Sequence, residues 1–253
     1  MKKIVRSLIR YFGVDIVRYY PASGTNLPPL PDVSTNDLAI LKQVVGRTMT
    51  SVERQATLVS AVRHLARAQI KGCLVECGVW RGGSSMVAAL TLIEERQTDR
   101  QLYLFDTFQG MTVPTDADRS VYGVSAQELL DRDVSRTGVW CVADLADVQR
   151  GMKSTGYPID HIHYVQGPVE TTIPGQSPAE PIALLRLDTD WYESTRHELV
   201  HLFPRLVDGG ILIVDDYGAW EGARKAVDEY LAELPRPLYL HRIDDTGRLL
   251  IKS

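Results

Sequence analysis

The chain has 253 residues, of which 44% are hydrophobic and 24% charged, and its formal net charge at pH 7 is -4. This length and composition allow one sizeable core, which favours a single α/β domain. The slightly acidic balance, with no lysine- or arginine-rich block, provides no general attraction for nucleic acid, so we expect no nucleic-acid partner.

Residues 1–46 are predicted to form an extension in front of the main domain. Between residues 2 and 12, apolar side chains share one helical face and lysines and arginines the other, which indicates a basic amphipathic helix. Residues 21–31 contain four prolines and predict a loop. We expect the extension to act as a lid or as a subunit contact in a homo-oligomer. The alternative is a helix that lies on a membrane surface.

Membrane spans and disulfides are not expected. No apolar stretch approaches the roughly 20 residues that a spanning helix needs, and the N-terminus lacks an uninterrupted signal-peptide core. The three cysteines are odd in number, and Cys73 and Cys77 flank an apolar run typical of a buried strand rather than of a ligand pair. We therefore expect a cytoplasmic protein.

Residues 47–253 carry the pattern of an α/β domain. Thr50 with Glu53 fits a capping box at the start of a helix. Short apolar or β-branched runs follow at residues 73–78, 102–106, 162–166, 182–188 and 210–215. Because helical patterns lie between most of these runs, we predict a mostly parallel sheet with helices on both faces. Two further runs, at residues 238–243 and 249–252, predict a C-terminal antiparallel hairpin.

The first run leads into a glycine-rich turn and a helix, in the segment Glu76-Cys-Gly-Val-Trp-Arg-Gly-Gly-Ser-Ser85. Open α/β sheets bind ligands at this place. Glycines there let the backbone approach a nucleoside, and the amides at the helix start suit an anion such as the methionine carboxylate. The alternative is a plain strand-to-helix turn, because a glycine-rich loop alone is weak evidence. The spacing is not G-x-G-x-x-G, which argues against a pyrophosphate ligand.

The second run ends in Asp106. An acid at this strand end can accept both ribose hydroxyls of a nucleotide, whether NAD or S-adenosylmethionine. Residues 111–125 follow and contain Asp116, Asp118 and Arg119. We expect this segment to form part of a lid, with a disordered surface loop as the alternative.

Four carboxylates follow the next two strands. Asp188 and Asp190 come after one run, and Asp215 and Asp216 after the other. Because neighbouring parallel strands end at one edge of a sheet, these acids are expected to surround one point and repel each other. A hard divalent cation relieves that repulsion, and Mg²⁺ fits better than Zn²⁺. The alternative is that each acid caps the following helix.

The segment His197-Glu-Leu-Val-His201 matches the zinc-protease pattern H-E-x-x-H. On a helix, Leu199 and Leu202 share the apolar face, and both histidines are predicted to face solvent on the opposite side. No third zinc ligand is evident nearby, so we do not expect a zinc protease.

Taken together, the segments over residues 47–230 resemble the macrocin O-methyltransferase family, which includes enzymes that methylate deoxysugars on macrolide and aminocoumarin antibiotics. Further matching segments are Phe-Asp-Thr-Phe-Gln-Gly-Met, Gln-Gly-Pro-Val-Glu-Thr-Thr-Ile-Pro, Leu-Arg-Leu-Asp-Thr-Asp-Trp-Tyr-Glu-Ser-Thr and Gly-Gly-Ile-Leu-Ile-Val-Asp-Asp-Tyr. The resemblance implies a class I methyltransferase domain over residues 47–253, with a Rossmann-like sheet. It also implies S-adenosylmethionine as methyl donor and Mg²⁺ as cofactor.

The resemblance further implies roles for single residues. It assigns Mg²⁺ to Asp188, Asp215 and Asp216, and the general base to Asp190, with Asp188 as the alternative base. It places S-adenosylmethionine against Thr50, Glu76, Gly78, Arg81, Gly82, Gly83, Ser84, Ser85, Asp106, Phe108, Gly110, Gly167, Val169 and Asp188. The family's usual Gly between the two aspartates is Thr189 here and Trp191 follows, so the acceptor is not carried over.

We expect an enzyme that methylates a hydroxyl of a deoxysugar on a glycosylated natural product, its partner being a small-molecule glycoside. A non-sugar vicinal diol such as a catechol is the alternative acceptor. A nicotinamide-dependent oxidoreductase could use the same loop and Asp106, but has no need of Asp215 and Asp216. A non-catalytic S-adenosylmethionine-binding protein is a third hypothesis, which predicts no metal dependence.

Overall fold

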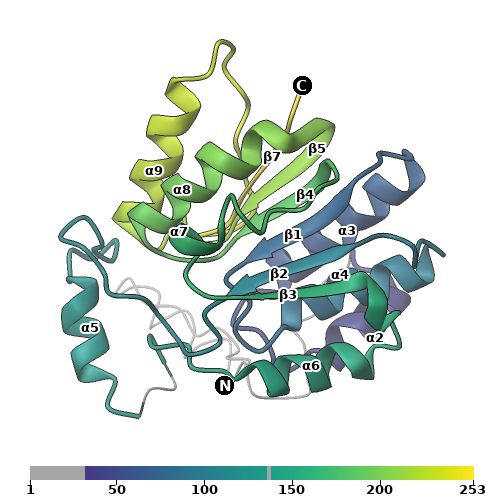
Figure 1. Ribbon diagram of the computed structural model, residues 1–253, viewed down its shortest axis with the longest axis horizontal. Helices are drawn as coiled ribbons and strands as arrows, with labels where there is room; N and C mark the ends of the chain where they lie inside the picture. Colours follow the sequence, from purple (N-terminus) through teal and green to yellow (C-terminus); the bar gives the residue numbers. More distant parts are fainter. Residues whose placement is uncertain (1–31, 136–137) are drawn as a thin grey trace, which may run out of the picture.

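A computed structural model of the protein describes residues 32–135 and 138–253. Within these residues one seven-stranded sheet has the order β3-β2-β1-β4-β5-β7-β6 (Figure 1). The strands are β1 (Cys73–Cys77), β2 (Leu102–Asp106), β3 (Ile162–Gln166), β4 (Ile182–Leu187), β5 (Leu206–Val214), β6 (His241–Arg242) and β7 (Arg248–Ile251). The first five strands pair in parallel, and β7 pairs antiparallel with both β5 and β6. The predicted mostly parallel sheet with a C-terminal antiparallel hairpin is confirmed.

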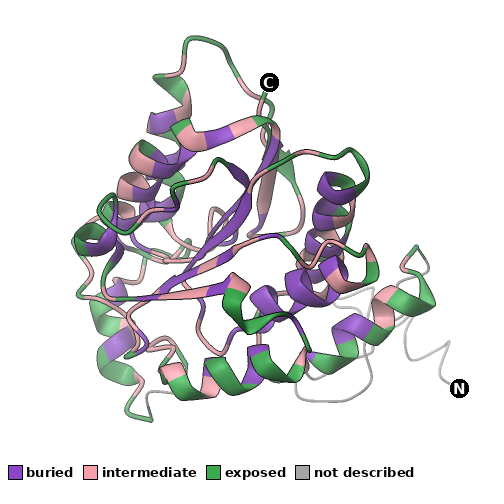
Figure 2. Cartoon of the chain, turned by 45° about the vertical axis from the view of Figure 1, so that its right-hand side comes forward, coloured by how far each residue is buried: buried purple, intermediate pink, exposed green. Residues whose placement is uncertain are grey.

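Helices cover both faces of this sheet (Figures 1 and 2). One face carries α2 (Thr35–Gln43), α3 (Val52–Arg67), α4 (Gly83–Glu94) and α6 (Leu145–Ser154). The other carries α7 (Val169–Thr172), α8 (Tyr192–Leu202) and α9 (Glu221–Ala232). None of the helices in the described part of the chain is long and apolar enough to cross a membrane.

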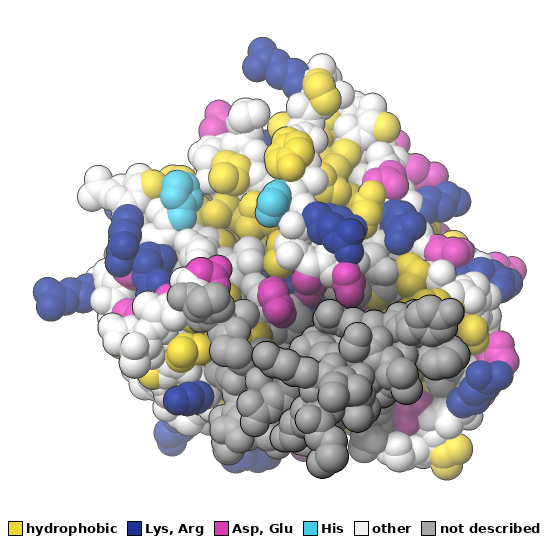
Figure 3. Space-filling view, turned by 180° about the vertical axis from the view of Figure 1, so that it is seen from behind, with side chains coloured by type: hydrophobic (Ala, Val, Ile, Leu, Met, Phe, Trp, Pro, Cys, Tyr) yellow, Lys and Arg dark blue, Asp and Glu magenta, His cyan; other side chains and the backbone are white. Residues whose placement is uncertain are grey.

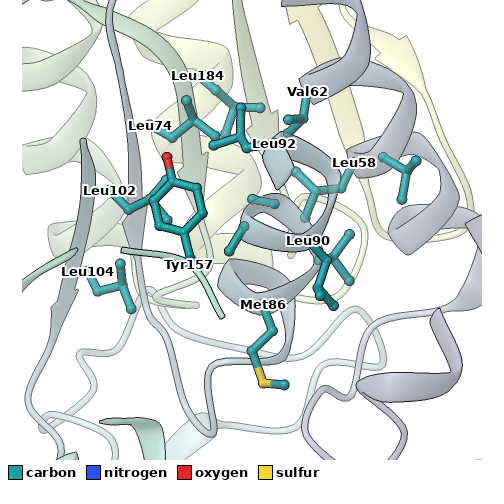
Figure 4. Packing of buried hydrophobic residues seen from close by; sticks show 14 of the residues in the cluster. Leu58, Val62, Leu74, Met86, Leu90, Leu92, Leu102, Leu104, Tyr157 and Leu184 are labelled. Carbon is teal, nitrogen blue, oxygen red and sulfur yellow. The ribbon is translucent and has the colours of Figure 1, made fainter. Parts of the chain in front are cut away.

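The core is divided between these two faces because successive strand residues point in opposite directions. In β1, Leu74 packs into the first cluster, whereas Val75 and Cys77 pack into the second. Figure 4 shows the first cluster, in which leucines of β1, β2 and β4 meet Leu58 of α3 and Met86 of α4. Burial on both faces explains why the central strands β1 and β4 are nearly continuous apolar runs, whereas the edge strand β3 carries His163 and Gln166.

The predicted extension is described only in part. The predicted helix at residues 2–12 and the loop at residues 21–31 lie outside the described residues. The extension's last helix, α2, begins after Ser34, whose Oγ accepts the N–H of Asp37 at 3.1 Å. Its Ile40 and Leu41 are buried in the first cluster. The division into an extension at residues 1–46 and a domain at residues 47–253 stays a prediction.

The start of α3 differs from the prediction by one residue. Ser51, not Thr50, is the N-cap, and its Oγ accepts the N–H of Arg54 at 3.0 Å. The Thr50 hydroxyl instead contacts the hydroxyl of Thr48 at 2.9 Å. The capping box with Glu53 was therefore wrong, because the serine one position later supplies the cap.

The prediction that both histidines of α8 face solvent was also wrong. His197 and His201 are half-buried, with ring centroids 4.4 Å apart. Nε2 of His197 lies 2.9 Å from the main-chain oxygen of Ile173. The segment after α7 therefore covers the side of α8 that was expected to be exposed. Glu198 between them is fully buried.

The sheet ends at the two-residue strand β6. Short edge strands limit unwanted pairing with other chains. Tyr239 before β6 is 81% exposed, and Ile251 of β7 is 50% exposed. On the side of the molecule opposite to Figure 1, hydrophobic side chains gather in the upper part, with charged side chains of both signs around them (Figure 3).

Candidate active site

A cavity of about 480 Å³ lies at the carboxyl ends of the five parallel strands. Its lining includes residues that directly follow each of them: Gly78 after β1, Asp106 at the end of β2, Gly167 after β3, Asp188 after β4 and Asp215 after β5. Open α/β sheets bind ligands at this edge, and the volume is typical of small-molecule sites. The cavity is therefore the candidate active site within the described residues.

The end of β2 is tied to the glycine-rich loop after β1. Oδ2 of Asp106 accepts the N–H groups of Val79 at 2.6 Å and Trp80 at 3.0 Å. Oδ1 accepts the N–H of Phe108 at 2.6 Å. Burial raises the pKa of Asp106, and these three donors partly offset that effect. A carboxylate has about four acceptor positions, so Asp106 retains about one for a ligand hydroxyl.

Gly78 fits a close approach of two strand ends. Its φ is +81°, and a Cβ there would lie 2.0 Å from the main-chain oxygen of Asp188. No side chain is compatible with that contact, so the loop after β1 and the loop after β4 touch through this glycine. The N–H of Gly83, at the start of α4, donates to the main-chain oxygen of Arg47 at 3.0 Å. That amide is therefore occupied, whereas Ser84 beside it lines the cavity.

Three of the predicted carboxylates converge. Asp188, Asp215 and Asp216 each present one oxygen, and these three atoms lie within 4.8 Å of one another. Oδ2 of Asp216 is buried and has no hydrogen-bond partner among the described residues. Burial raises the pKa of Asp188 and of Asp216, and neighbouring aspartates raise both further. Oxygen donors, crowded negative charge and one orphaned oxygen fit a hard divalent cation. No histidine belongs to this group.

Two arginines that were not predicted from the sequence neutralise part of this charge. Arg186 of β4 is buried and donates to Asp188 at 2.7 Å and to Asp215 at 2.6 Å. Arg54 of α3 pairs with Asp215 as well, and with Asp244 at 3.0 Å. A charged residue inside an apolar strand needs a buried partner, so Arg186 in Leu-Leu-Arg-Leu-Asp was a usable signal. Arg54 gives no comparable signal, because it lies on a helix with a polar face.

Asp190 lies beside the three converging acids but does not belong to their group. It lines the same cavity and has a left-handed backbone, with φ of 67°. Burial, assisted by the charges of Asp188 and Asp215, raises the pKa of Asp190 to about 7, although its hydrogen bond with Asp216 opposes the change. A carboxylate with a pKa near neutrality can both take up and release a proton at physiological pH. Asp190 therefore has the properties of a general base.

Residues 111–125, expected to form part of a lid, are a wall segment whose Met111 and Thr112 line the cavity and whose later residues contact two helices. Fully buried Asp118 accepts the N–H of Tyr192 at 2.7 Å, at the start of α8. The main-chain oxygen of Arg119 accepts the N–H of Glu221 at 2.8 Å, at the start of α9. The N-cap residues of both helices are tryptophans that make no side-chain cap bond, so this wall segment supplies the caps. The alternative of a disordered loop was wrong.

We expect Asp118→Asn to lower the free energy of unfolding by about 1 kcal/mol, because a charged cap at a helix N-terminus is lost. Denaturant unfolding at neutral pH measures the change. The matched control is Asp116→Asn, since Asp116 lies two residues away and is exposed; its effect should stay within about 0.5 kcal/mol. Equal stability of the Asp118 variant and the wild type would show that the cap contributes nothing.

The predicted cofactor residues divide into two groups. Those that line the cavity are Thr50, Gly78, Ser84, Asp106, Gly110, Gly167, Val169 and Asp188. Those that do not are Glu76, Arg81, Gly82, Gly83, Ser85 and Phe108. Members of the second group have other partners: Glu76 bonds to Arg186 and to Ser85, and Arg81 pairs with Asp147 at 2.9 Å.

Several apolar residues also line the cavity, and they were not predicted. Its lining includes Met49, Met111, Val139, Cys141 and Trp220, which come from four separate segments. Trp220 packs edge-on against buried Trp191, with ring centroids 4.9 Å apart. No sequence motif marks these residues, because loops far apart in the chain bring them together. These apolar residues can contact an apolar part of a ligand whose polar part lies at the carboxylates.

Comparison with known proteins gives consistent matches. The model of the family described as macrocin-O-methyltransferase (TylF) matches residues 30–251. An 8-demethyl-8-(2,3-dimethoxy-alpha-L-rhamnosyl)-tetracenomycin-C 4'-O-methyltransferase of Streptomyces olivaceus is 34% identical over 206 residues, covering 80% of this chain and 74% of that protein. A mycinamicin III 3''-O-methyltransferase of Micromonospora griseorubida is 34% identical over 186 residues, covering 74% of this chain and 70% of that protein. The solved structure of the O-methyltransferase NovP superposes with a TM-score of 0.70, at 28% identity and 82% coverage of both chains.

Proposed function

Since the chain belongs to the macrocin O-methyltransferase family and is an S-adenosylmethionine-dependent O-methyltransferase, we propose that it methylates a sugar hydroxyl of a glycosylated natural product. The relatives named above act on a rhamnosyl tetracenomycin and on mycinamicin III. Family membership removes the nicotinamide-dependent oxidoreductase as an alternative. An acceptor of this kind has a polar sugar and a larger apolar body, which suits a cavity lined by both carboxylates and apolar side chains.

One observation carries the proposal: the loop after β1 and Asp106 border the same cavity as Asp188, Asp190, Asp215 and Asp216. A methyl donor held by the first group would therefore face an acceptor held by the second. Alignment of the two reactants in one cavity is the main requirement, because the methyl group of a sulfonium is already electrophilic.

On the donor side, we assign S-adenosylmethionine to the predicted residues that line the cavity. Asp106 would accept one ribose hydroxyl at its remaining acceptor position, and Gly78 and Ser84 would border the methionine portion. Gly167 and Val169 would border the adenine of S-adenosylmethionine. The predicted residues that do not line the cavity, such as Glu76 and Phe108, would support the cavity-lining residues without contacting the cofactor.

On the acceptor side, we assign Mg²⁺ to Asp188, Asp215 and Asp216. When bound, the cation would orient two vicinal oxygens of the acceptor and make one hydroxyl more acidic. Asp190 would accept the proton of that hydroxyl as the methyl group is transferred, with Asp188 as the alternative base. Arg186 and Arg54 would hold Asp215 in place and limit the repulsion among the acids.

The test is release of S-adenosylhomocysteine by the purified protein with a panel of deoxysugar glycosides and catechols, with Mg²⁺ and again with a chelator. We expect release with a glycoside and loss of that release on chelation. Preference for catechols would replace the sugar with a non-sugar diol as acceptor class. Binding of S-adenosylmethionine without turnover of any compound would favour a non-catalytic protein.

Asp106→Asn is expected to raise the Kd for S-adenosylmethionine by about 10- to 100-fold. The amide would present N–H groups to main-chain N–H donors and would lose charge-assisted hydrogen bonds, each worth about 1.5–3 kcal/mol. Isothermal titration with S-adenosylmethionine measures this change. The control is Asp99→Asn, which alters an exposed acid before the opposite end of β2. An unchanged Kd in the Asp106 variant would refute its ribose role.

A further inference from the structure

A buried carboxyl group that the proposed mechanism does not use lies beneath the loop between β4 and α8. Glu198 of α8 is 0% exposed. Its Oε2 accepts a hydrogen bond from Oγ1 of Thr189 at 3.2 Å, and its Oε1 has no partner among the described residues. A buried carboxyl group without a cation is costly, so its position suggests a specific task.

The loop that Glu198 contacts carries two of the acids at the cavity. Asp188 and Asp190 flank Thr189, and all three residues line the cavity. The N–H of Asp188 donates to the main-chain oxygen of Cys77 at 2.8 Å. The N–H of Trp191 donates to the main-chain oxygen of Thr189 at 2.8 Å. The first bond ties the start of the loop to β1, the second closes a tight turn within the loop, and the N–H of Tyr192 after the loop donates to Asp118 at 2.7 Å. The Thr189 hydroxyl is the side-chain contact at the centre of the loop.

The backbone of this loop is strained at Asp190. Its φ of 67° lies in the left-handed region, which costs a residue with a Cβ about 1–2 kcal/mol. Such a conformation persists only where surrounding contacts hold it. The hydrogen bond from Thr189 to Glu198 is one residue away and anchors the loop to α8, which is packed on the sheet.

We propose that Glu198 is a positioning residue that holds, through the Thr189 hydroxyl, the conformation in which Asp188 and Asp190 both border the cavity. The proposal rests on the proposed function for the roles of those two aspartates. It also assigns a role to Glu198, the acid of the H-E-x-x-H segment, for which we expect no zinc-protease function.

The protonation of Glu198 is compatible with this task. Burial raises the pKa of Glu198 well above its ordinary range, and the Thr189 hydroxyl opposes that change. A neutral carboxyl group is less costly to bury than a charged one and still accepts a hydrogen bond from a hydroxyl. Glutamine has the same shape and acceptor, so it should replace Glu198 with little loss.

The experiment compares matched pairs of variants. Thr189→Val and Glu198→Met remove the hydrogen bond with little change in size, whereas Thr189→Ser and Glu198→Gln retain it. For each, kcat, the KM values of both substrates and the Kd of Mn²⁺ without acceptor are measured. Mn²⁺ binding, followed by electron paramagnetic resonance, reports on Asp188 independently of turnover. The Kd of S-adenosylmethionine serves as the check of folding.

We expect Thr189→Val and Glu198→Met each to lower kcat by about 10- to 100-fold, as displacement of a reacting group by about 1 Å can do. Both should weaken Mn²⁺ binding and leave S-adenosylmethionine binding unchanged. Thr189→Ser and Glu198→Gln should retain most activity. The kcat of the double variant should be no lower than that of the less active single variant, because both substitutions remove the same contact.

Wild-type kcat and Mn²⁺ affinity in Thr189→Val would overturn the proposal, as would losses that multiply in the double variant. If Glu198→Met fails to bind S-adenosylmethionine, the comparison of Thr189→Val with Thr189→Ser decides. A wild type that neither binds Mn²⁺ nor methylates any acceptor overturns the proposed function and this inference together. A wild type that does both, with variants equal to it, overturns this inference alone.

Discussion

Asp190→Asn is expected to lower kcat by about 100- to 10,000-fold, the range typical of a lost general base. Asparagine has nearly the same shape and is among the residues that best tolerate a positive φ, so the loop should keep its conformation. Its amide cannot take up the acceptor proton. The Kd of S-adenosylmethionine should change by less than about 3-fold, because the variant removes an interaction made in the transition state.

Steady-state turnover with saturating substrates, together with titration of S-adenosylmethionine, measures both effects. The control is Asp245→Asn, which alters a fully exposed aspartate in the turn between β6 and β7. Strong residual turnover in the Asp190 variant would contradict the assignment of the base and would favour Asp188 in that role.

Asp216→Asn should lower kcat/KM for the acceptor by about 100-fold or more at a fixed Mg²⁺ concentration, and chelation should do the same to the wild type. Loss of a cation that stabilises developing charge costs several kcal/mol in the transition state. Asp216 is the ligand to change because its Oδ2 makes no hydrogen bond and it pairs with no arginine among the described residues. Replacement of Asp215 would instead release both Arg54 and Arg186.

The matched control for Asp216 is Asp208→Asn, an exposed position near the opposite end of β5. This control should keep full activity and full sensitivity to the chelator. Excess Mg²⁺ should partly restore the Asp216 variant, because its defect lies in cation affinity. Turnover that survives chelation in the wild type would exclude the metal-dependent mechanism.

Much of the fold could be predicted because the central strands β1 and β4 are buried on both faces. The run from Cys73 to Cys77 is fully buried, so every position is apolar or internally paired. Errors arose where neighbours decide the outcome. Either Thr50 or Ser51 could cap α3. The cover over His197 comes from the segment after α7, which the residue pattern of α8 itself does not encode.

The acids of the candidate site could be predicted because topology alone brings parallel strand ends together. Their counterions could not be foreseen as a set: Arg54 comes from α3, more than a hundred residues before Asp215. The positions of the apolar residues that line the cavity also depend on how the loops pack. Met111 and Trp220 belong to segments whose mutual position no local pattern encodes.

The wall segment, residues 111–125, constrains how this protein can acquire a new acceptor. Residues beside this segment border the acceptor side of the cavity, so a change in acceptor preference would be selected there first. The same segment caps α8 and α9, the helices that begin just after Asp190 and Asp216. Insertions or deletions in the wall would therefore disturb the reaction chemistry along with the preference. Diversification should proceed by side-chain exchange at Met111 or Val139, with the length of the segment kept constant.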